Sequence, residues 1–289
     1  MPTILLTGAT SGLGHATARI LLRDPKLRLI LGARNPTDPR LAEFPAERFQ
    51  CLPLDLTDLA AVRRFADAVE GPLEGVALNA GIQVTGGLTR TADGYETDVA
   101  ANHLGHAALI AALGDKIAPG ASIVTTGSGT HAAEDRIARL FGFKGGHAVS
   151  VYEMAKGIGD DGAQGDRDRY ATSKLAQTAW TLGRARHDVQ RTWLVFDPGL
   201  MPGTALARDR SAAEQFAWNH VLPRLRPLIR GVSSAEQSAT QLARLLRTGT
   251  AASGPAIDHM GRPALLSATA KASSWQDQVV EETPAILGS

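Results

Sequence analysis

The sequence lacks the features that would tie the protein to a membrane, a nucleic acid or an oxidising compartment. Cys51 is the only cysteine among 289 residues, so no disulfide can form within the chain. Thirty basic and 29 acidic residues leave a formal net charge of +1, with no long block of one sign that would suggest a nucleic-acid surface. No apolar run approaches the ~20 residues that a membrane span needs. The start MPTILLTGAT has no basic segment typical of a signal peptide. We therefore expect a soluble, cytoplasmic protein.

What the sequence does contain is a regular alternation of short apolar runs and longer helical patterns. The runs predicted as strands are Thr3–Thr7, Leu27–Ala33, Arg48–Leu54, Gly75–Asn79, Ala121–Thr126, Thr192–Phe196 and a short Pro255–Ile257. The predicted helices are Leu13–Leu22, Thr57–Val69 with Thr57 as N-cap, Asp93–Leu113, Tyr170–Val189 and Ser233–Leu246. Continuous apolar strands alternating with helices are typical of a parallel sheet covered on both faces. We predict a single α/β domain over residues 1–289, with a doubly wound, Rossmann-type sheet.

Two segments interrupt this alternation. One is an insertion at about residues 132–168, and the other is a proline-containing segment at about 200–232. Both follow predicted strands, at the sheet edge where open α/β folds bind ligands. We expect the second segment to form a substrate lid.

A glycine-rich turn joins the first predicted strand to the first helix, with the spacing GxxxGxG. Its candidate cofactor-binding residues are Gly8, Thr10, Ser11, Gly12, Leu13 and Gly14. Glycines let the backbone approach a pyrophosphate closely, and the free N–H groups of a helix start attract its negative charge. A plain tight turn is the alternative, but the position between strand and helix favours dinucleotide binding.

Arg34 lies at the end of the second predicted strand, in the stretch Gly32-Ala33-Arg34-Asn35. A carboxylate here would bind the ribose 2′-hydroxyl of NAD, whereas an arginine accommodates the 2′-phosphate of NADP. The first carboxylate after Arg34 is Asp38. We therefore favour NADP(H), with a solvated arginine as the alternative.

The order of these and later motifs resembles the short-chain dehydrogenase/reductase family over about residues 3–205, and more weakly to 257. Besides the turn, the matching positions are Asp55-Leu56, Asn79-Ala80-Gly81, Asn102, Ser128, Tyr170-x-x-x-Lys174 and Pro198-Gly199. The stretches TADGYE at 91–96 and NHLGH at 102–106 are similar to the branch of retinol dehydrogenases, protochlorophyllide reductases and WW-domain oxidoreductases. The resemblance implies catalytic roles for Ser128, Tyr170, Lys174 and Asn102, and cofactor contacts by the other matching residues.

Two departures from the family pattern affect single residues. Thr204, which would face the nicotinamide amide, is displaced by one position after Pro198-Gly199. Cys51 lies on the third predicted strand, away from the expected site. That position argues against a light-driven protochlorophyllide reductase, because the resemblance associates that activity with an active-site cysteine.

The pattern Tyr-x-x-x-Lys occurs twice, as Tyr152/Lys156 and as Tyr170/Lys174. The two side chains share a face only where a helix continues. Three glycines between 157 and 162 make a continued helix after Tyr152 unfavourable, whereas no glycine or proline follows Tyr170 before Gly183. Tyr170/Lys174 is therefore the predicted catalytic pair.

The predicted chemistry is hydride transfer between NADP(H) and a carbonyl or alcohol, with Tyr170 as general acid/base. We expect Lys174 and the nicotinamide charge to lower the pKa of Tyr170 from ~10 by about two to three units. Ser128 would orient the substrate oxygen. By resemblance, Lys174 would hold the nicotinamide ribose and Asn102 would position a water in the proton path. A non-catalytic, cofactor-sensing regulator and an isomerase or dehydratase that uses bound cofactor are the alternatives.

The insertion places 42 residues between Ser128 and Tyr170, and loops of such length are usually functional or disordered. We predict that Phe141, Phe143 and Tyr152 line the substrate pocket together with Met201 of the lid; a solvated excursion is the alternative. By resemblance to monomeric carbonyl reductases with an insertion here, we expect a monomer. His103, His106 and His131 are expected to pack within the fold rather than to bind a metal, because no cysteine or carboxylate completes a set.

Overall fold

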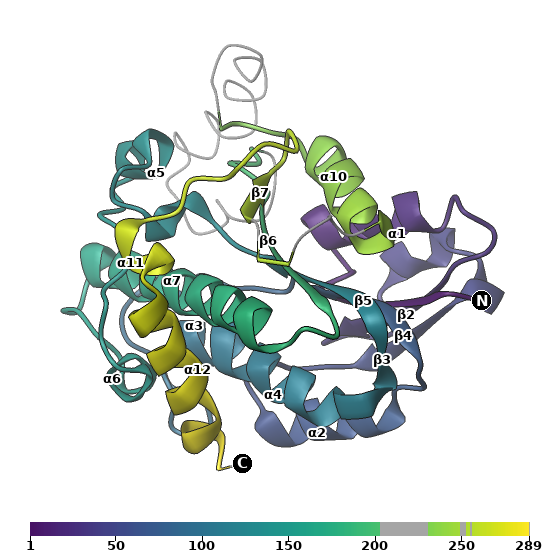
Figure 1. Cartoon of the computed structure of the whole chain (residues 1–289), viewed down its shortest axis with the longest axis horizontal. Coiled ribbons are helices and arrows are strands. Elements are labelled where there is room, and N and C mark those ends of the chain that lie inside the picture. The colour runs from purple at the N-terminus through teal and green to yellow at the C-terminus, as the bar shows by residue number, and fades with distance from the viewer. Residues whose placement is uncertain (203–230, 249–252, 255, 289) are drawn as a thin grey trace.

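A seven-stranded parallel sheet forms the centre of the molecule (Figure 1). The computed structural model describes residues 1–202, 231–248, 253–254 and 256–288. The strand order is β3-β2-β1-β4-β5-β6-β7. The strands are β1 (Thr3–Thr7), β2 (Arg28–Ala33), β3 (Phe49–Pro53), β4 (Leu73–Leu78), β5 (Ile117–Thr126), β6 (Thr192–Asp197) and β7 (Ala256–Asp258). In this order β2 and β3 extend the sheet on one side of β1, and β4 to β7 extend it on the other side. The strand order thus reverses between β1 and β4, which confirms the predicted doubly wound fold.

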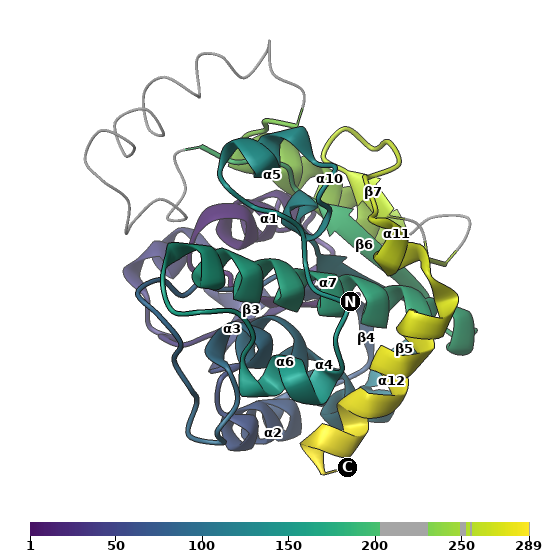
Figure 2. The ribbon, with the colours of Figure 1, turned by 90° about the vertical axis from the view of Figure 1, so that its left-hand side faces the viewer.

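Helices cover both faces of the sheet (Figures 1 and 2). One face carries α1 (Gly12–Leu21) and α10 (Ala235–Thr248), and the other carries α2 (Leu59–Ala68), α4 (Gly105–Leu113) and α7 (Ala163–His187). The shorter segments are α3 (Thr97–Val99), α5 (Arg136–Leu140), α6 (Val151–Lys156), α11 (Ala268–Lys271), the π-helical turn η3 (Ala100–Leu104) and the 3₁₀ turns η1 (Pro39–Glu43), η2 (Ala46–Arg48), η4 (Gly114–Lys116) and η5 (Gly129–His131). A last helix, α12, spans Ser273–Leu287. None of the helices in the described ranges is both long and apolar enough to cross a membrane.

The carboxyl ends of the central strands lie level with one another, and the register shift between β4 and β5 falls near their amino ends, between Leu73 and Gly75. Thr7 of β1 is opposite Gly32 of β2, and Thr126 of β5 is opposite Phe196 of β6. The segments that follow these strands therefore meet along one edge of the sheet. This is where the sequence analysis expects the cofactor and the substrate.

Two helical predictions were wrong in detail. Asp58 rather than Thr57 caps α2, accepting a bond from the backbone N–H of Ala61 at 3.0 Å. Helix α7 begins at Ala163 instead of Tyr170. The segment Asp93–Leu113 is helical from Thr97 onward as α3, η3 and α4, with Glu96 as the N-cap. Tyr152 and Lys156 lie on a short helix, α6, which a capping box starts at Ser150 and which does not continue past Gly157.

The C-terminal helix α12, which the sequence analysis did not anticipate, runs along α7 and reaches the helices near the site (Figure 2). His103 Nε2 lies 2.9 Å from Thr283 Oγ1, and the Tyr95 hydroxyl donates to the carbonyl of Ile286 at 2.8 Å. A Cβ added at Gly183 of α7 would lie 2.6 Å from Val280. The close approach of α12 to α7 therefore depends on the missing side chain of Gly183.

Gly105 offers a direct test of the packing between α4 and the β3–α2 connection. A Cβ there would lie 2.3 Å from the carbonyl oxygen of Leu56. Helix propensity alone makes Gly→Ala favourable by about 1 kcal/mol, but overpacking usually costs about 1–3 kcal/mol. We expect Gly105→Ala to lower the free energy of unfolding, measured by urea denaturation. The exposed Ala111→Gly calibrates the propensity effect, and a Gly105→Ala variant more stable than the wild type would refute the packing argument.

Candidate active site

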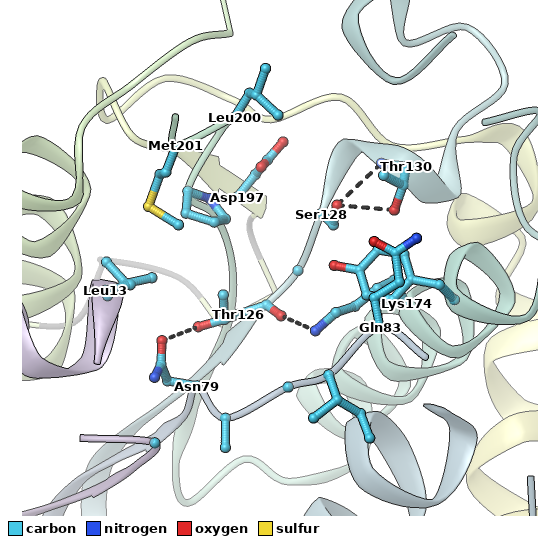
Figure 3. A pocket seen from close by; sticks show the side chains of 18 of the residues that line it. Leu13, Asn79, Gln83, Thr126, Ser128, Thr130, Lys174, Asp197, Leu200 and Met201 are labelled. Atoms are coloured by element: carbon cyan, nitrogen blue, oxygen red, sulfur yellow. Dashed lines mark hydrogen bonds between the residues drawn. The ribbon is translucent and has the colours of Figure 1, made fainter. Parts of the chain in front are cut away.

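A cleft of about 1630 Å³ lies along the carboxyl ends of the strands (Figure 3). It runs from the glycine turn after β1 to the segments after β5 and β6. Twenty of the predicted site residues line it: Gly8, Thr10, Ser11, Gly12, Leu13, Gly14, Arg34, Asp55, Leu56, Asn79, Ala80, Gly81, Ser128, Phe141, Phe143, Tyr170, Lys174, Pro198, Gly199 and Met201. The fold thus brings together residues that are far apart in the sequence.

The glycine turn has the geometry that a pyrophosphate cradle requires. Gly8 and Gly12 have φ angles of 75° and 53°, which favour glycine. A Cβ at Gly14 would lie 2.2 Å from the carbonyl oxygen of Gly8, so the turn is tight, whereas a Cβ at Gly12 would meet no atom within 4 Å. Ser11 precedes α1 without a side-chain capping bond. The first N–H groups of α1 are therefore available to an anion in the cleft.

Arg34 is exposed at the end of β2 and lines the same cleft. Within the described ranges it makes no hydrogen bond or ion pair. Asp38, the nearest following carboxylate, is held by Arg40, whose Nε and Nη2 lie 2.8 and 2.7 Å from its two oxygens. This pairing lowers the pKa of Asp38 to about 2, chiefly through the hydrogen bond to the Arg40 side chain. The free cation and the engaged carboxylate fit a 2′-phosphate better than a 2′-hydroxyl.

Ser128 follows β5 and caps η5 (Figure 3). Its Oγ accepts hydrogen bonds from the N–H and hydroxyl of Thr130, at 3.3 and 3.0 Å. Ser128 is also close enough to Tyr170 to oppose the rise in the pKa of that phenol. His131 Nδ1 lies 2.6 Å from the carbonyl oxygen of Ser128, which fixes the backbone at this point. The sequence analysis did not identify Thr130, and nothing in the sequence motif marks it.

Tyr170 lies in α7 and is only 9% exposed. Burial raises the pKa of Tyr170 to about 12, although the hydrogen bond with Ser128 opposes this shift. The expectation that the surrounding protein lowers this pKa was therefore wrong for the groups that the structure describes, because desolvation of the phenolate dominates. The tyrosine holds its proton at neutral pH.

Lys174 lies one turn further along α7 and is buried. Its Nζ donates to the carbonyl oxygen of Thr126 at 3.1 Å (Figure 3). It also donates to Oε1 of Gln177 at 3.1 Å. Burial lowers its pKa to about 8, and Asp98 opposes that shift. At pH 7 the lysine is therefore still mostly an ammonium. It faces the cleft beside Gly81, whose added Cβ would lie 3.3 Å from Nζ.

Asn102 is fully buried in η3 and does not line the cleft. Its amide donates to the carbonyl of Ile82 and to the hydroxyl of Ser173, both at 2.9 Å, and its Oδ1 accepts from the N–H of Ile82 at 2.9 Å. Asn102 thus links the segment after β4 to α7. Both amide protons are used within the protein, so only the amide oxygen has capacity left for a water.

Asp98 is a buried carboxylate beside this site that the sequence analysis missed. Its Oδ1 accepts from the N–H of Val84 at 2.9 Å, while its Oδ2 has no hydrogen-bond partner among the described residues. Burial raises the pKa of Asp98 to about 8, and the neighbouring Glu96 adds to the rise. Asp166 and Arg169 form a buried ion pair nearby at 2.5 Å, and Asp166 also accepts from the N–H groups of Gly86 and Gly87.

The predicted substrate residues fall into two groups. Phe141 and Phe143 of the insertion line the cleft, and the ring of Phe143 lies 6.0 Å from that of Tyr170 between centroids. Met201 is buried beside the cleft. The prediction for Tyr152 was wrong: it is 59% exposed and lies in a separate groove on α6, with Lys156 Nζ 4.1 Å from its ring centroid. Gly157 ends α6, and neither Tyr152 nor Lys156 lines the cleft that holds Tyr170.

Pro198 and Gly199 follow β6 and are fixed by the start of α10. The hydroxyls of Ser233 and Ser238 donate to the carbonyl of Pro198, at 2.5 and 2.8 Å. Gly199 has a φ of 68° and a closely packed His259 behind it. Thr204 and most of the predicted lid, 203–230, lie outside the described residues.

A family model for short chain dehydrogenases matches residues 2–157, which is more than half of the chain. The chain belongs to the short-chain dehydrogenase family. The match contains the glycine turn, Asn79-Ala80-Gly81, Asn102 and Ser128, and α7 follows it with Tyr170 and Lys174.

Individual relatives agree with this assignment. A chloroplastic protochlorophyllide reductase of Daucus carota is 29% identical over 230 residues, covering 72% of this chain and 58% of that protein. The chain therefore spans little more than half the length of that relative. Among solved structures, an uncharacterised protein from Mycobacterium paratuberculosis has a TM-score of 0.73 at 22% identity, covering 100% of this chain and 94% of that one. An NADPH-bound carbonyl reductase from chicken fatty liver has a TM-score of 0.63 at 16% identity, covering 92% and 99%. Both structures share the fold.

The raised pKa of Asp98 predicts that the folded state becomes less stable as the pH rises. The folded protein holds this proton up to about pH 8, whereas an unfolded chain loses it near pH ~4. Folding stability should therefore fall as the pH rises from 4 to 8. Asparagine keeps the acceptor for Val84 and cannot ionise. We expect Asp98→Asn to gain in melting temperature relative to the wild type between pH 5 and pH 8.

The exposed Asp67→Asn on α2 serves as the control and should show no such trend. A constant difference between Asp98→Asn and the wild type over this pH range would contradict the buried, protonated state of Asp98.

Proposed function

We propose that the protein is an NADP(H)-dependent oxidoreductase that interconverts a carbonyl and an alcohol. The observation that carries this proposal is the grouping of Ser128, Tyr170 and Lys174 at one cleft. The two hydroxyls line the same cleft as the buried ammonium of Lys174, and the cleft continues to the glycine turn. The geometry provides a proton donor, an oxygen-binding group and a cofactor groove in one continuous space.

The residues present fit a dinucleotide along this groove. The N–H groups at the start of α1 would hold the pyrophosphate, and Arg34 would hold the 2′-phosphate. Asp55 and Leu56 would lie against the adenine, and Asn79 to Gly81 would line the middle of the groove. Lys174 would bind the nicotinamide ribose, and Pro198 and Gly199 would lie against the nicotinamide. When bound, NADPH supplies the hydride that adds to the carbonyl carbon.

The side chains of this protein then handle the oxygen and the proton. Ser128 hydrogen-bonds the carbonyl oxygen and directs it to Tyr170. As charge grows on that oxygen, Tyr170 gives up its hydroxyl proton to complete the alcohol. The ammonium of Lys174 stabilises the phenolate that remains. Solvent returns a proton to Tyr170, and in the reverse direction the same groups remove a proton from an alcohol.

Reduction is the direction that the electrostatics favour. Burial keeps Tyr170 protonated, which is the state that a general acid needs. The NADPH-bound carbonyl reductase with the same fold is consistent with this direction. A monomeric state and a cytoplasmic location remain predictions of the sequence.

Two alternatives have less support. A non-catalytic cofactor sensor has no need for Ser128 and Tyr170 at the same cleft as a buried Lys174. A light-driven protochlorophyllide reductase is suggested by the Daucus carota relative. Cys51, however, lies in β3 and does not line the cleft, and burial raises its pKa to about 11. Within the described residues, then, the cleft offers no cysteine for that activity.

The duplicated Tyr-x-x-x-Lys pattern supplies a matched pair of variants for the central role of Tyr170. Tyr170→Phe removes the proton donor and should lower kcat for NADPH-dependent reduction by about 10²–10⁴-fold. Tyr152→Phe should leave kcat unchanged, because that side chain lies outside the cleft. A panel of aldehydes and ketones supplies the substrate, and NADPH binding to Tyr170→Phe is checked by fluorescence. Full turnover by Tyr170→Phe would disprove the proposed function.

Arg34→Ala tests the cofactor preference. Loss of a guanidinium that binds the 2′-phosphate should raise KM for NADPH by about 10- to 100-fold, since charged hydrogen bonds contribute about 1.5–3 kcal/mol. The KM for NADH should change little. Arg63→Ala, on the exposed surface of α2, is the control. A wild type that prefers NADH, with a preference unchanged by Arg34→Ala, would overturn the choice of NADP(H).

A further inference from the structure

Behind the cleft, hydrogen bonds link a closed ring of residues that includes Lys174. On one side of the ring, Lys174 Nζ donates to the carbonyl of Thr126 at 3.1 Å. The hydroxyl of Thr126 donates to Asn79 Oδ1 at 3.4 Å (Figure 3). Asn79 Nδ2 donates to the carbonyl of Thr7 at 2.9 Å. The ring therefore connects the lysine with the ends of three central strands, β5, β4 and β1.

The other side of the ring runs through two fully buried side chains that the proposed mechanism has not used. Lys174 Nζ lies 3.1 Å from Gln177 Oε1, and Gln177 Nε2 lies 3.1 Å from His106 Nδ1. His106 Nε2 lies 3.2 Å from Thr7 Oγ1, which closes the ring. Gln177 and His106 are both 0% exposed. Neither side chain touches the cleft, so direct contact with substrate or cofactor does not account for them.

The chemistry of the ammonium sets the direction of these bonds. An ammonium can only donate hydrogen bonds, so Gln177 must turn its oxygen to Lys174 and its NH₂ group to His106. His106 Nδ1 must then accept, and the single proton of the neutral ring lies on Nε2 and points to Thr7. Burial lowers the pKa of His106 to about 3, so the ring is neutral at physiological pH.

The opposite tautomer of His106 has a partner of its own. With the proton on Nδ1, the ring would donate to the carbonyl of Asn102, at 3.3 Å. Gln177 would then have to present its oxygen to His106 and its NH₂ group to Lys174. Two donors would face each other at Lys174 unless the lysine lost its charge. The tautomer of His106 is therefore linked to the charge on Lys174.

We propose that Gln177 and His106 are positioning residues that hold Lys174 as a charged, oriented ammonium through the N–H of His106 and the amide of Gln177. This inference rests on the proposed function for the role that it gives to Lys174. The chain also ties the lysine to Thr7, whose hydroxyl donates its proton to the carbonyl of Ala77 at 3.2 Å. The Thr7 oxygen accepts from the N–H groups of Asn79 and Ala80 at 2.9 Å each, and the His106 N–H shares that oxygen with them. The lysine and the backbone of the cofactor groove are thus held by one network.

The titratable groups near Lys174 must be considered together. They are Tyr170, which lines the same cleft on its own helix, Asp98 on α3 and His106 on α4. Only the ionised form of Asp98 favours the charged lysine, and Glu96 and Arg169 act on Asp98 in turn. None of these groups except His106 is bonded to Gln177. A change at Gln177 therefore acts on Lys174 without directly removing another charge.

Two substitutions at Gln177 should move the alkaline limb of the pH profile in opposite directions. Gln177→Leu removes the acceptor, so Lys174 loses its proton more easily, and kcat/KM for NADPH-dependent aldehyde reduction should fall at a pH about one unit lower. Gln177→Glu presents a carboxylate, and the fall should move about one unit higher. Thr181→Val, one turn further on α7, removes a buried hydroxyl that bonds Thr125 and the backbone carbonyl of Gln177 but not the Gln177 side chain, and should leave the limb unchanged. Folded Leu and Glu variants that both keep the wild-type limb would overturn the proposal.

The second measurement needs no substrate and therefore separates this inference from the proposed function. In protein labelled with ¹⁵N-histidine, the wild type at pH 7 should show His106 with a protonated Nε2 and a bare Nδ1. In Gln177→Glu the proton should move to Nδ1, because the carboxylate can only accept. The signal is assigned by its loss in His106→Gln. A wild-type Nδ1–H tautomer would overturn the proposal even if Tyr170→Phe confirms the proposed function.

Discussion

The structure depends on the cost of burying the ammonium of Lys174. A buried charge is tolerated only when it is paired or fully hydrogen-bonded. Here the bonds come from the end of β5 and from the next turn of α7, so the helix and the sheet are fixed relative to each other at this point. Tyr170 is one turn away on the same helix, and Ser128 is two residues after the end of β5. The same interactions that satisfy the charge therefore place the two hydroxyls together.

The burial that makes the lysine costly also sets the acid–base properties of the site. Low exposure raises the pKa of Tyr170 and lowers that of Lys174, so each shift disfavours the charged form. Phe143 and the rest of the insertion contribute to this burial, since Phe143 packs beside the Tyr170 ring. The insertion thus affects the chemistry of the site besides forming part of its wall. The extended start of α7, with its Asp166–Arg169 pair, anchors the insertion next to the glycine loop at 86–87.

The sequence predicted the parts of this arrangement that depend on local pattern. The strands, the glycine turn and the choice of Tyr170 over Tyr152 follow from periodicity and from the positions of glycines. Gly157 ends α6, so the helix does not continue past the glycines, as expected, and a capping box at Ser150 starts it. The early start of α7 was not predictable in this way, because residues 163–169 are polar and their burial comes from contacts with distant segments. The π-helical turn at Asn102, the packing of α12 and the buried state of Asp98 likewise depend on tertiary contacts that a single sequence does not display.

We propose that proton donation by Tyr170 depends on a charged Lys174. The most direct test is the pH dependence of kcat/KM for NADPH-dependent carbonyl reduction by the wild type between pH 6 and 10. We expect a constant rate at low pH and a fall as the pH rises through about 8, where burial places the pKa of Lys174. A rate that stays constant, or rises, up to pH 10 would contradict it.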